Sequence, residues 1–436
     1  MSHKQEIRDP IYNFIRLGAE ERKVLDSVPF QRLRHIHQLA LTSFLYPGAT
    51  HKRFEHSLGV MELAGRVYDV VTDSDNLIDR SVRKLVPRKG DYKYEYWRLV
   101  LRMAALCHDL GHLPFSHAAE KELLPDGWNH ERLTLKIIRS EEMKPIWDDI
   151  KVNPEDVAML AVGPENYKGK EYSDLEAILS EIIVGDAFGV DRMDYLLRDS
   201  HHIGVAYGRF DHYRLIDSLR ILPRGDDSQE PGLGVDEGGL HSAEALILAR
   251  YFMFTQVYCH HVRRIYDIHL KDFLMKWLPK GHFSTELDEH LAMTDNEINV
   301  ALLRSANDAK LPGHDAAKRI VRRNHFRLLY QRNPSDLKKN QEACRAVYEA
   351  VSDSFGEDDV RFDSYRQTGG GLDFPVLGRD GRIASSLYMS ETLARVPVVA
   401  EEYVFISPEI REDAKRWLEK NRESIIASSR EEDEES

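Results

Sequence analysis

The sequence is poor in cysteine and lacks long apolar runs. Its 436 residues include three cysteines (Cys107, Cys259 and Cys344), which lie far apart and form no C-x-x-C pair. We therefore predict a reduced, cytoplasmic protein without structural disulfides. No stretch approaches the roughly 20 apolar residues that span a bilayer, and the first residues contain no apolar run that could serve as a signal peptide. We expect no membrane partner.

An excess of positive charge is also absent. Lys and Arg number 60 against 73 Asp and Glu, which gives a formal net charge of −13. Nonspecific phosphate binding calls for clustered cations, so we do not expect nucleic acid as a partner. Part of the charge lies in residues 430–436, which we interpret as a solvated, disordered tail. Short basic stretches remain at 31–34, 51–53 and 318–327.

Apolar residues recur mostly at helical spacing, which predicts a mainly α protein. Helices are expected within 58–71, 96–106, 175–188, 192–197, 240–277 and 408–421, and strands at 374–377, 396–400 and 403–406. Residues 9–15 and 46–49 have the character of extended or turn segments, and 223–239, rich in Gly and Pro, is expected to form a loop between helices. We predict a helical core over 1–330 with an N-terminal extended segment, a helical and α+β module over 331–427, and an acidic tail over 428–436.

A His-Asp pair follows the apolar segment 99–106 and is the most informative feature of the chain. Burying His108 and Asp109 there is costly unless a metal or a hydrogen-bonding network compensates. His56 and Asp191 are candidate partners, and their separation in sequence requires three helices to converge. Gly111, just after the pair, would permit close helix packing. Four of the 20 histidines fall between His108 and Glu131, although a His-Asp dipeptide can also be a surface pair or a hydrogen-bonded core pair.

Two imidazoles and two carboxylates suit a divalent metal ion such as Mn, Fe or Zn better than Mg. We therefore predict His56, His108, Asp109 and Asp191 as metal ligands. Adjacent helical residues point about 100° apart, so either one ion lies at the edge of the pair or Asp109 bridges two ions. No thiolate belongs to the set, which argues against a closed structural zinc site.

Longer motifs surround these residues. They are FQRLRHIHQL at 30–39, YPGATHKRFEHSLG at 46–59, HDLGHLPFSH at 108–117 and DRMDYLLRDSHHIG at 191–204. Over roughly residues 5–330 the chain resembles the HD-domain metal phosphohydrolases, and within them the dNTP triphosphohydrolase branch of animal sterile-alpha-motif/HD-domain enzymes and bacterial homologues. The C-terminal module is similar to that of the bacterial members alone, and no sterile-alpha-motif domain is present. The resemblance implies an HD-domain helical bundle.

Two other branches of the superfamily fit less well. Cyclic-dinucleotide phosphodiesterases carry Gly-Tyr-Pro after the His-Asp pair, and none is present here. Alarmone hydrolases carry an acidic pair where this chain has His112-Leu113.

The resemblance also implies catalytic residues. A dNTPase of this kind releases deoxynucleoside and inorganic triphosphate, and the leaving 5′-oxygen needs a proton. His117 matches the general acid, His112 lies near the α-phosphate, and His130 and Glu131 orient the acid or relay protons. Each histidine could alternatively be a packing residue bonded to a backbone carbonyl.

By the same resemblance, cationic and aromatic residues bind the substrate. Arg53 and Arg192 match phosphate contacts, with Arg192 standing where the animal enzyme has lysine, and Arg250 and Tyr258 match a family Arg…Tyr-x-His element. Gln38 and Asp199 would bind the 3′-hydroxyl, while Leu39 and Tyr195 leave no space for a 2′-hydroxyl. The residues matched as substrate-binding are Gln38, Leu39, Arg53, Arg192, Tyr195, Asp199, Arg250 and Tyr258.

A second nucleotide is implied by residues away from the metal. Asp26, Gln31 and Arg34 match positions that recognise an activating nucleotide, and Arg323 and Arg327 match a phosphate-binding helix. In the family these pockets form between subunits, which predicts a homo-oligomer, either a dimer or a tetramer. Tyr12-Asn13 replaces the usual His-Gly of the activator loop, and a charged surface helix is the alternative.

We expect a metal-dependent dNTP triphosphohydrolase that takes a dNTP substrate and a divalent metal cofactor. One alternative is an HD-type nuclease or phosphodiesterase acting on DNA ends or on another nucleotide. The other is a nucleotide-sensing, non-catalytic protein.

Overall fold

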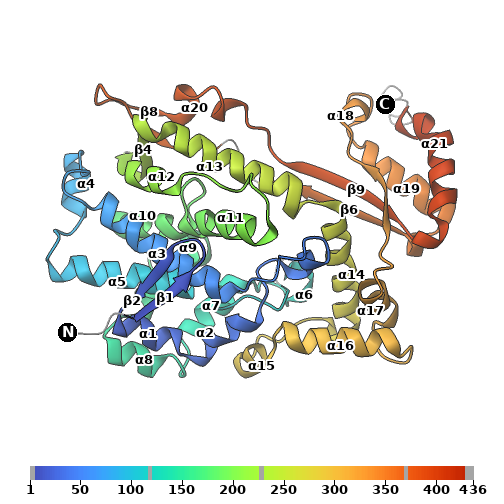
Figure 1. The fold of residues 1–436 in the computed structure, drawn as a ribbon, viewed down its shortest axis with the longest axis horizontal. Helices are drawn as coiled ribbons and strands as arrows, with labels where there is room; N and C mark the ends of the chain where they lie inside the picture. The colour runs from blue at the N-terminus through green and yellow to red at the C-terminus, as the bar shows by residue number, and fades with distance from the viewer. Residues whose placement is uncertain (1–4, 116–119, 225–229, 368–371, 428–436) are drawn as a thin grey trace. The chain divides into compact units, whose positions relative to one another are not determined.

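The computed structural model describes residues 5–115, 120–224, 230–367 and 372–427. These divide into two compact units: the first draws on the described residues within 1–253, 283–297 and 370–396, and the second on those within 254–282, 298–369 and 397–436. Helices dominate, accompanied by small sheets (Figure 1). The mainly α fold with a small α+β part is confirmed, whereas the domain boundaries expected at 330 and 427 remain predictions.

Helices make up most of the first unit. They are α1 (Ala19–Leu25), α2 (Val28–Arg32), α3 (Arg53–Val71), α4 (Arg80–Leu85), α5 (Tyr92–Cys107), α6 (Glu120–Leu123), α7 (His130–Ile138), α8 (Lys144–Ile150), α9 (Pro154–Asn166), α10 (Asp174–Val184), α11 (Val190–Ile203), α12 (His212–Ser218), α13 (Leu240–Met253), α15 (Leu287–Ala292) and α20 (Ser386–Met389). None of the helices in the described ranges has both the length and the apolar character needed to cross a bilayer.

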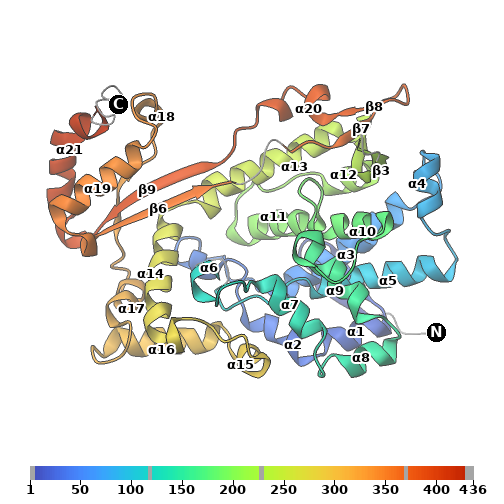
Figure 2. The ribbon, with the colours of Figure 1, turned by 180° about the vertical axis from the view of Figure 1, so that it is seen from behind.

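Helix α3 is the central element of this unit. It packs against α5, α10 and α11 (Figures 1 and 2), and Leu58, Met61 and Val67 on it are buried. Its start is fixed by Glu55, whose carboxylate accepts a hydrogen bond from the Lys52 N–H at 2.9 Å and so caps the helix. The helices expected at 58–71 and 96–106 are confirmed by α3 and α5.

The turn after α5 passes close to α7. A Cβ on Gly111 would lie 2.1 Å from the His130 carbonyl oxygen and 2.3 Å from the Thr134 nitrogen. The Gly111 N–H instead donates to Thr134 Oγ1 at 2.9 Å. The expected role of Gly111 in close helix packing is therefore confirmed.

Two small sheets belong to the first unit. Strands β1 (Gln5–Asp9) and β2 (Asn13–Leu17) form an antiparallel hairpin, whose turn places Asn13 at φ 66°. A four-stranded sheet has the order β3 (Leu219–Pro223), β4 (Pro231–Asp236), β7 (Pro375–Leu377) and β8 (Ile383–Ser385), with β4 and β7 parallel.

The expectation of a loop over 223–239 was wrong for residues 231–236, which form β4 and pair with β3 in an antiparallel ladder. The glycines in this region do not interrupt the strands. At Gly234, the missing side chain lets β4 lie close to β7. A Cβ on Gly234 would lie 2.2 Å from the Pro375 carbonyl oxygen of the neighbouring strand β7, so only glycine fits that position.

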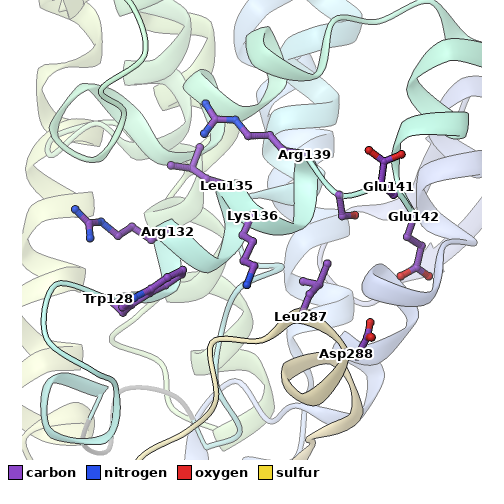
Figure 3. A pocket seen from close by; sticks show the side chains of 10 residues that line it. Trp128, Arg132, Leu135, Lys136, Arg139, Glu141, Glu142, Leu287 and Asp288 are labelled. Atoms are coloured by element: carbon purple, nitrogen blue, oxygen red, sulfur yellow. The ribbon is translucent and has the colours of Figure 1, made fainter.

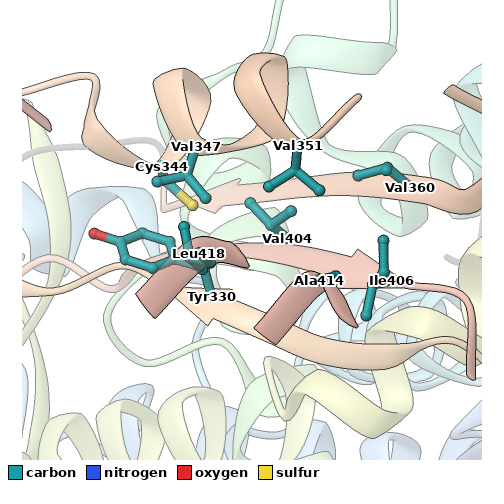
Figure 4. Close-up of a cluster of buried hydrophobic side chains, with 9 residues drawn as sticks. All are labelled: Tyr330, Cys344, Val347, Val351, Val360, Val404, Ile406, Ala414 and Leu418. Atoms are coloured by element: carbon teal, nitrogen blue, oxygen red, sulfur yellow. The ribbon is translucent and has the colours of Figure 1, made fainter. Parts of the chain in front are cut away.

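The second unit contains a three-stranded antiparallel sheet with the order β5 (Arg327–Gln331), β9 (Ala400–Ile406) and β6 (Val360–Arg366). Its other described helices are α14 (His261–Trp277), α17 (His314–Val321), α18 (Pro334–Leu337), α19 (Ala343–Phe355) and α21 (Arg411–Ala427), and α16 (Asp295–Asn307) enters it from the first unit. Helices α19 and α21 pack against the sheet around one apolar cluster (Figure 4). The cluster contains Tyr330, Cys344, Val347, Val351, Val360, Val404, Ile406, Ala414 and Leu418.

Two expectations needed correction here. The helix predicted over 240–277 is interrupted, because α13 is followed by a π-helical turn at Phe254–Tyr258 and α14 begins only at His261. Within the second unit, the Cys259 carbonyl accepts a hydrogen bond from the Tyr403 hydroxyl at 2.7 Å instead of a helical partner. The strand expected at 396–400 begins only at Ala400, since Pro397 has no N–H to donate to a ladder.

Candidate metal centre

Three helices of the first unit bring together a set of potential metal ligands. His56 lies on α3, His108 directly follows the last residue of α5, and Asp191 lies in the first turn of α11. One ligand atom from each of these residues lies within 4.8 Å of the others. His56 Nε2 is 3.0 Å from Asp191 Oδ1, and His108 Nε2 is 3.5 Å from the same oxygen. The two histidines are buried, whereas the Asp191 side chain is 36% exposed and leaves the cluster open on one side.

The remaining predicted ligand, Asp109, lies beside this set. Its oxygens are 3.3 Å from His108 Nε2 and 3.7 Å from His56 Nε2, and Arg53 Nη1 donates to it at 2.5 Å. Burial raises the pKa of Asp109, but Arg53 and the neighbouring histidines outweigh burial and hold that pKa well below its usual value. Asp109 is therefore a carboxylate placed to join a metal or to hold Arg53.

The protonation pattern of His108 suits metal ligation. Its Nδ1 is 2.8 Å from the Ala105 carbonyl oxygen, which can only accept, so Nδ1 carries a hydrogen and the neutral ring would present a lone pair at Nε2. Among the described residues, this buried Nε2 has no hydrogen-bond partner of ordinary geometry. A backbone carbonyl behind the ring and a free lone pair in front are the usual arrangement of a metal-binding histidine. The donor set therefore fits a divalent ion.

A buried ion-pair network orients His56 from behind. His56 Nδ1 is 2.8 Å from Asp194 Oδ2. Asp194 also accepts two hydrogen bonds of 2.9 Å from Arg198 and one of 2.8 Å from the Tyr12 hydroxyl, and Arg198 reaches Asp9 at 2.9 Å. Burial lowers the pKa of His56, but hydrogen bonds with Asp191 and Asp194 outweigh burial and raise it to about 10.

Sequence reasoning missed this support. The available signal was the Asp194–Arg198 spacing of four residues on the helix that carries Asp191. Tyr12, noted only as a departure from the family's activator loop, is buried and bonded to Asp194.

Gly59 on α3 makes room for the network, which leads to a stability prediction. A Cβ there would lie 1.9 Å from Asp194 Oδ1 and 2.5 Å from Arg198 Nη2. Gly59→Ala is expected to lower the free energy of unfolding by about 1–3 kcal/mol, because neither buried side chain can move aside freely. Denaturant unfolding measures the effect. The control is Gly378→Ala, whose Cβ would meet mainly the exposed Asp380 side chain; equal losses in the two variants would contradict the prediction.

Next to the metal set lies a pair of stacked imidazoles. His112 and His130 have ring centroids 4.0 Å apart, and His112 Nε2 is 3.0 Å from Asp109 Oδ1. Burial, Arg53 and His130 keep the pKa of His112 well below its usual value. Burial also lowers the pKa of His130, but Glu120 outweighs burial and raises it.

His130 is oriented mainly by a residue that the sequence did not indicate. Its Nδ1 lies 2.8 Å from Glu120 Oε1, compared with 3.4 Å from Glu131. Ligand atoms of His112, Glu120 and His130 also lie within 4.8 Å of one another. His117, the predicted general acid, lies outside the described residues.

Gln38 and Asp199, the two residues matched to the 3′-hydroxyl, both contact His51, which was not predicted from the sequence. His51 Nε2 is 2.7 Å from Asp199 Oδ1, and the His51 carbonyl accepts the Gln38 N–H at 3.0 Å. Gln38 and Leu39 are each 8% exposed. Among the described residues, Gln38 Oε1 is buried without a hydrogen-bond partner.

The other residues matched as substrate-binding are divided between the units. Arg192 donates to the Gly185 carbonyl at 2.8 Å, and both Arg192 and Arg250 reach the Asp186 carbonyl. Burial raises the pKa of the Tyr195 hydroxyl. Tyr258 belongs to the second unit.

The predicted activator residues are likewise divided. In the first unit, Arg34 donates to Gln31 at 2.8 Å and its guanidinium lies 3.5 Å from the Phe54 ring centroid, while Asp26 pairs with Arg22 at 2.5 Å. In the second unit, Arg323 has φ 55° and Arg327 Nη1 is 2.6 Å from His325 Nε2. The activator site and the homo-oligomer that it implies remain predictions.

A separate pocket lies along α7 (Figure 3). It is lined by Trp128, Arg132, Leu135, Lys136, Arg139, Ser140, Glu141, Glu142, Leu287 and Asp288. Its cations already have partners: Lys136 donates to the Thr285 carbonyl at 2.7 Å, and Arg139 forms two hydrogen bonds with Glu155 at 2.7 and 2.6 Å. None of the residues predicted for the active site lines this pocket.

Comparisons with known proteins place the fold in a family. The HD domain model matches residues 53–180, and the HD associated region model matches residues 210–360. A crystal structure of a hypothetical protein from Aquifex aeolicus matches with a TM-score of 0.78 and 32% identity, covering 95% of this chain and 100% of that one. The chain belongs to the HD-domain family.

Curated relatives of this HD-domain protein include both uncharacterised and named proteins. Uncharacterized protein MJ1154 of Methanocaldococcus jannaschii is 31% identical over 76% of this chain and 60% of its own length. The human deoxynucleoside triphosphate triphosphohydrolase SAMHD1 is 29% identical over 76% of this chain and 55% of its own length. Uncharacterized protein YwfO of Bacillus subtilis is 34% identical over 63% and 56%, respectively. The matches thus span 55–60% of the length of these relatives.

Proposed function

We propose that this HD-domain protein uses a divalent metal to hydrolyse deoxynucleoside triphosphates to deoxynucleoside and inorganic triphosphate. The observation that carries the proposal is the convergence of His56, His108 and Asp191, in which the buried His108 Nε2 makes no hydrogen bond of ordinary geometry among the described residues and lies next to the Arg53–Asp109 pair. The similarity to named dNTP triphosphohydrolases over three quarters of the chain supports the choice of substrate.

In this proposal His56, His108 and Asp191 would hold the ion, and Asp109 would complete the set or help to hold a second ion. The mixture of imidazoles and carboxylates favours Mn, Fe or Zn over Mg. When bound, the ion would polarise phosphate oxygens and lower the pKa of a water molecule.

In this proposal the cationic side chains bind the triphosphate of the substrate. Arg53 is buried with its guanidinium on Asp109, which fixes its direction before substrate arrives. Arg192 and Arg250 both reach the Asp186 carbonyl, so the two guanidinium groups are held at one point of the chain. Planar guanidinium groups suit two-point contacts with phosphate oxygens.

Proton transfer to the leaving 5′-oxygen is assigned to the histidines. The stacked pair supports this assignment, because His112 is kept neutral while Glu120 favours the charged form of His130. We retain His117 as the general acid and Glu131 as an auxiliary group.

Selection of deoxyribose is assigned to the segment around Gln38. Gln38 and Asp199 would bind the 3′-hydroxyl, and both are tied to His51. The unpartnered Gln38 Oε1 supports a role in accepting a ligand hydroxyl. Leu39 and Tyr195 would exclude a 2′-hydroxyl sterically.

A product assay tests the proposal. Purified protein loaded with Mn²⁺ is incubated with each of the four dNTPs and the four NTPs, with and without GTP or a second dNTP as activator. We expect equimolar deoxynucleoside and inorganic triphosphate from dNTPs and at least about 10-fold slower release from NTPs, because steric exclusion of one oxygen discriminates modestly. Ion chromatography separates triphosphate from the mono- and diphosphates that other hydrolases release.

Two results would contradict the proposal. One is the absence of triphosphate under every activator condition. The other is cleavage of a labelled single-stranded DNA with no cleavage of dNTPs, which would favour the nuclease alternative.

A further inference from the structure

A buried carboxylate outside the metal set holds two loops of the first unit. Asp295, the first residue of α16, is fully buried. Its Oδ1 accepts the Phe115 N–H at 2.8 Å, and its Oδ2 accepts the His37 N–H at 2.7 Å. His37 Nδ1 lies 2.6 Å from the same Oδ2. The carboxylate therefore joins the segment that contains Phe115 to the segment that precedes Gln38.

The contact extends to a third segment. Lys52 Nζ lies 2.6 Å from His37 Nε2. An ammonium group can only donate, so Nε2 accepts and Nδ1 carries the hydrogen that points at Asp295. Lys52 directly precedes Arg53, and the Lys52–His37–Asp295 chain thus reaches the start of α3.

Arg32 holds the same region through further hydrogen bonds. This arginine is buried; its Nη1 donates to the His112 carbonyl at 3.0 Å and its Nε to the Met293 carbonyl at 3.1 Å. Phe115 itself has φ 52°, a left-handed conformation that is unfavourable for a non-glycine residue and persists only where its surroundings impose it. The hydrogen bond to Asp295 is one such restraint.

We propose that Asp295 is a positioning residue for nucleotide hydrolysis. It sets the relative placement of the segments that carry His112, Gln38 and Arg53, without itself touching metal or substrate. An apolar residue could fill the same space, but it could not accept hydrogen bonds from two loop N–H groups and an imidazole. The inference rests on the proposed function, because the relative placement of the three segments affects catalysis only if all three contact the same substrate.

The test compares two substitutions with a matched control. Asp295→Ala removes every acceptor, and Asp295→Asn keeps one oxygen for the Phe115 N–H. The control, Asp336→Asn, alters another buried carboxylate, which accepts hydrogen bonds from the Tyr330 hydroxyl at 2.6 Å and from Arg422 at 2.5 Å in the second unit.

We expect Asp295→Ala to lower kcat/KM for dNTPs by about 100-fold, because small displacements of catalytic groups have effects of that size. Asp295→Asn should lower it less, and the metal content per chain should stay at the wild-type value in both. Asp336→Asn should lower the unfolding temperature and leave kcat/KM unchanged. The proposal would be overturned if the Asp295 variants lost bound metal as their kcat/KM fell. An equal fall of kcat/KM in the Asp336→Asn control would also overturn it.

Hydrogen exchange provides a readout that does not depend on activity. Amides in the peptides covering 36–39 and 110–115 should exchange faster in Asp295→Asn than in Asp336→Asn, and faster still in Asp295→Ala where that variant folds. Unchanged exchange in both peptides would overturn the role of Asp295. If the wild-type protein releases no triphosphate, the proposed function fails, and the exchange measurement still decides whether Asp295 holds these loops.

Discussion

His108→Ala is expected to abolish stable metal binding and to lower kcat/KM for dNTPs by more than about 100-fold. Substitutions behind a metal ligand typically cost 10- to 100-fold, so removal of a ligand itself should cost more. The substitution removes the buried Nε2, which makes no hydrogen bond of ordinary geometry among the described residues and lies 3.5 Å from Asp191 Oδ1. Elemental analysis of the purified protein gives the metal content, and triphosphate release gives the rate.

A second buried histidine supplies the control. His290 on α15 is 2% exposed and is not among the predicted site residues. His290→Ala should keep the wild-type metal content and kcat/KM even if it unfolds at a lower temperature. Wild-type metal content in His108→Ala would show that the ion, if any, binds elsewhere.

Arg198→Met is expected to lower the free energy of unfolding by about 3–5 kcal/mol, the usual cost of breaking a buried ion pair from one side. Arg198 is fully buried between Asp194 and Asp9, and methionine would fill its volume without its charge. The two carboxylates would then lose their main cationic partner in a place closed to water. Urea or guanidinium unfolding curves measure the change.

Arg98→Met is the matched exposed substitution. Arg98 forms two hydrogen bonds of 2.7 Å with Asp69 at the surface. Exposed pairs of this kind contribute about 0–1 kcal/mol. Losses of the same size in Arg98→Met and Arg198→Met would mean that burial does not set the strength of the Arg198 network.

The convergence of the potential metal ligands could be predicted because local and distant signals agreed. The His108-Asp109 pair follows an apolar helix, where burying polar groups is unfavourable unless they bind a metal or form hydrogen bonds. The surrounding motifs then identified His56 and Asp191 as partners in the fold. The structure brings one ligand atom of His56, His108 and Asp191 within 4.8 Å of the others.

The residues behind the ligands could not be predicted in the same way. Asp194, Glu120, His51 and Asp295 contact side chains and loops that are between 10 and 258 positions away in sequence. Asp194 has one local signal, its spacing of four residues from Arg198, but nothing in the local pattern of the other three distinguishes them from ordinary polar residues of a helix or loop. Their roles follow only from the three-dimensional packing of the elements that carry them.

The same division applies to the fold. Long amphipathic stretches such as 58–71 were predicted correctly, because helical periodicity is a local property. The β3–β4 hairpin was missed because its glycines were interpreted as chain breakers, whereas Gly234 is required by the neighbouring strand β7. The break between α13 and α14 coincides with a hydrogen bond from Tyr403, more than a hundred residues further along the chain.

The path of the chain limits how this protein can be shortened. Residues 372–396 return to the first unit, where β7 and β8 complete the sheet that β3 and β4 begin. A truncation after residue 330, intended to isolate the catalytic half, would therefore remove two strands from the part that it aims to keep. Strand β4 would lose its parallel neighbour and present a bare edge that invites aggregation.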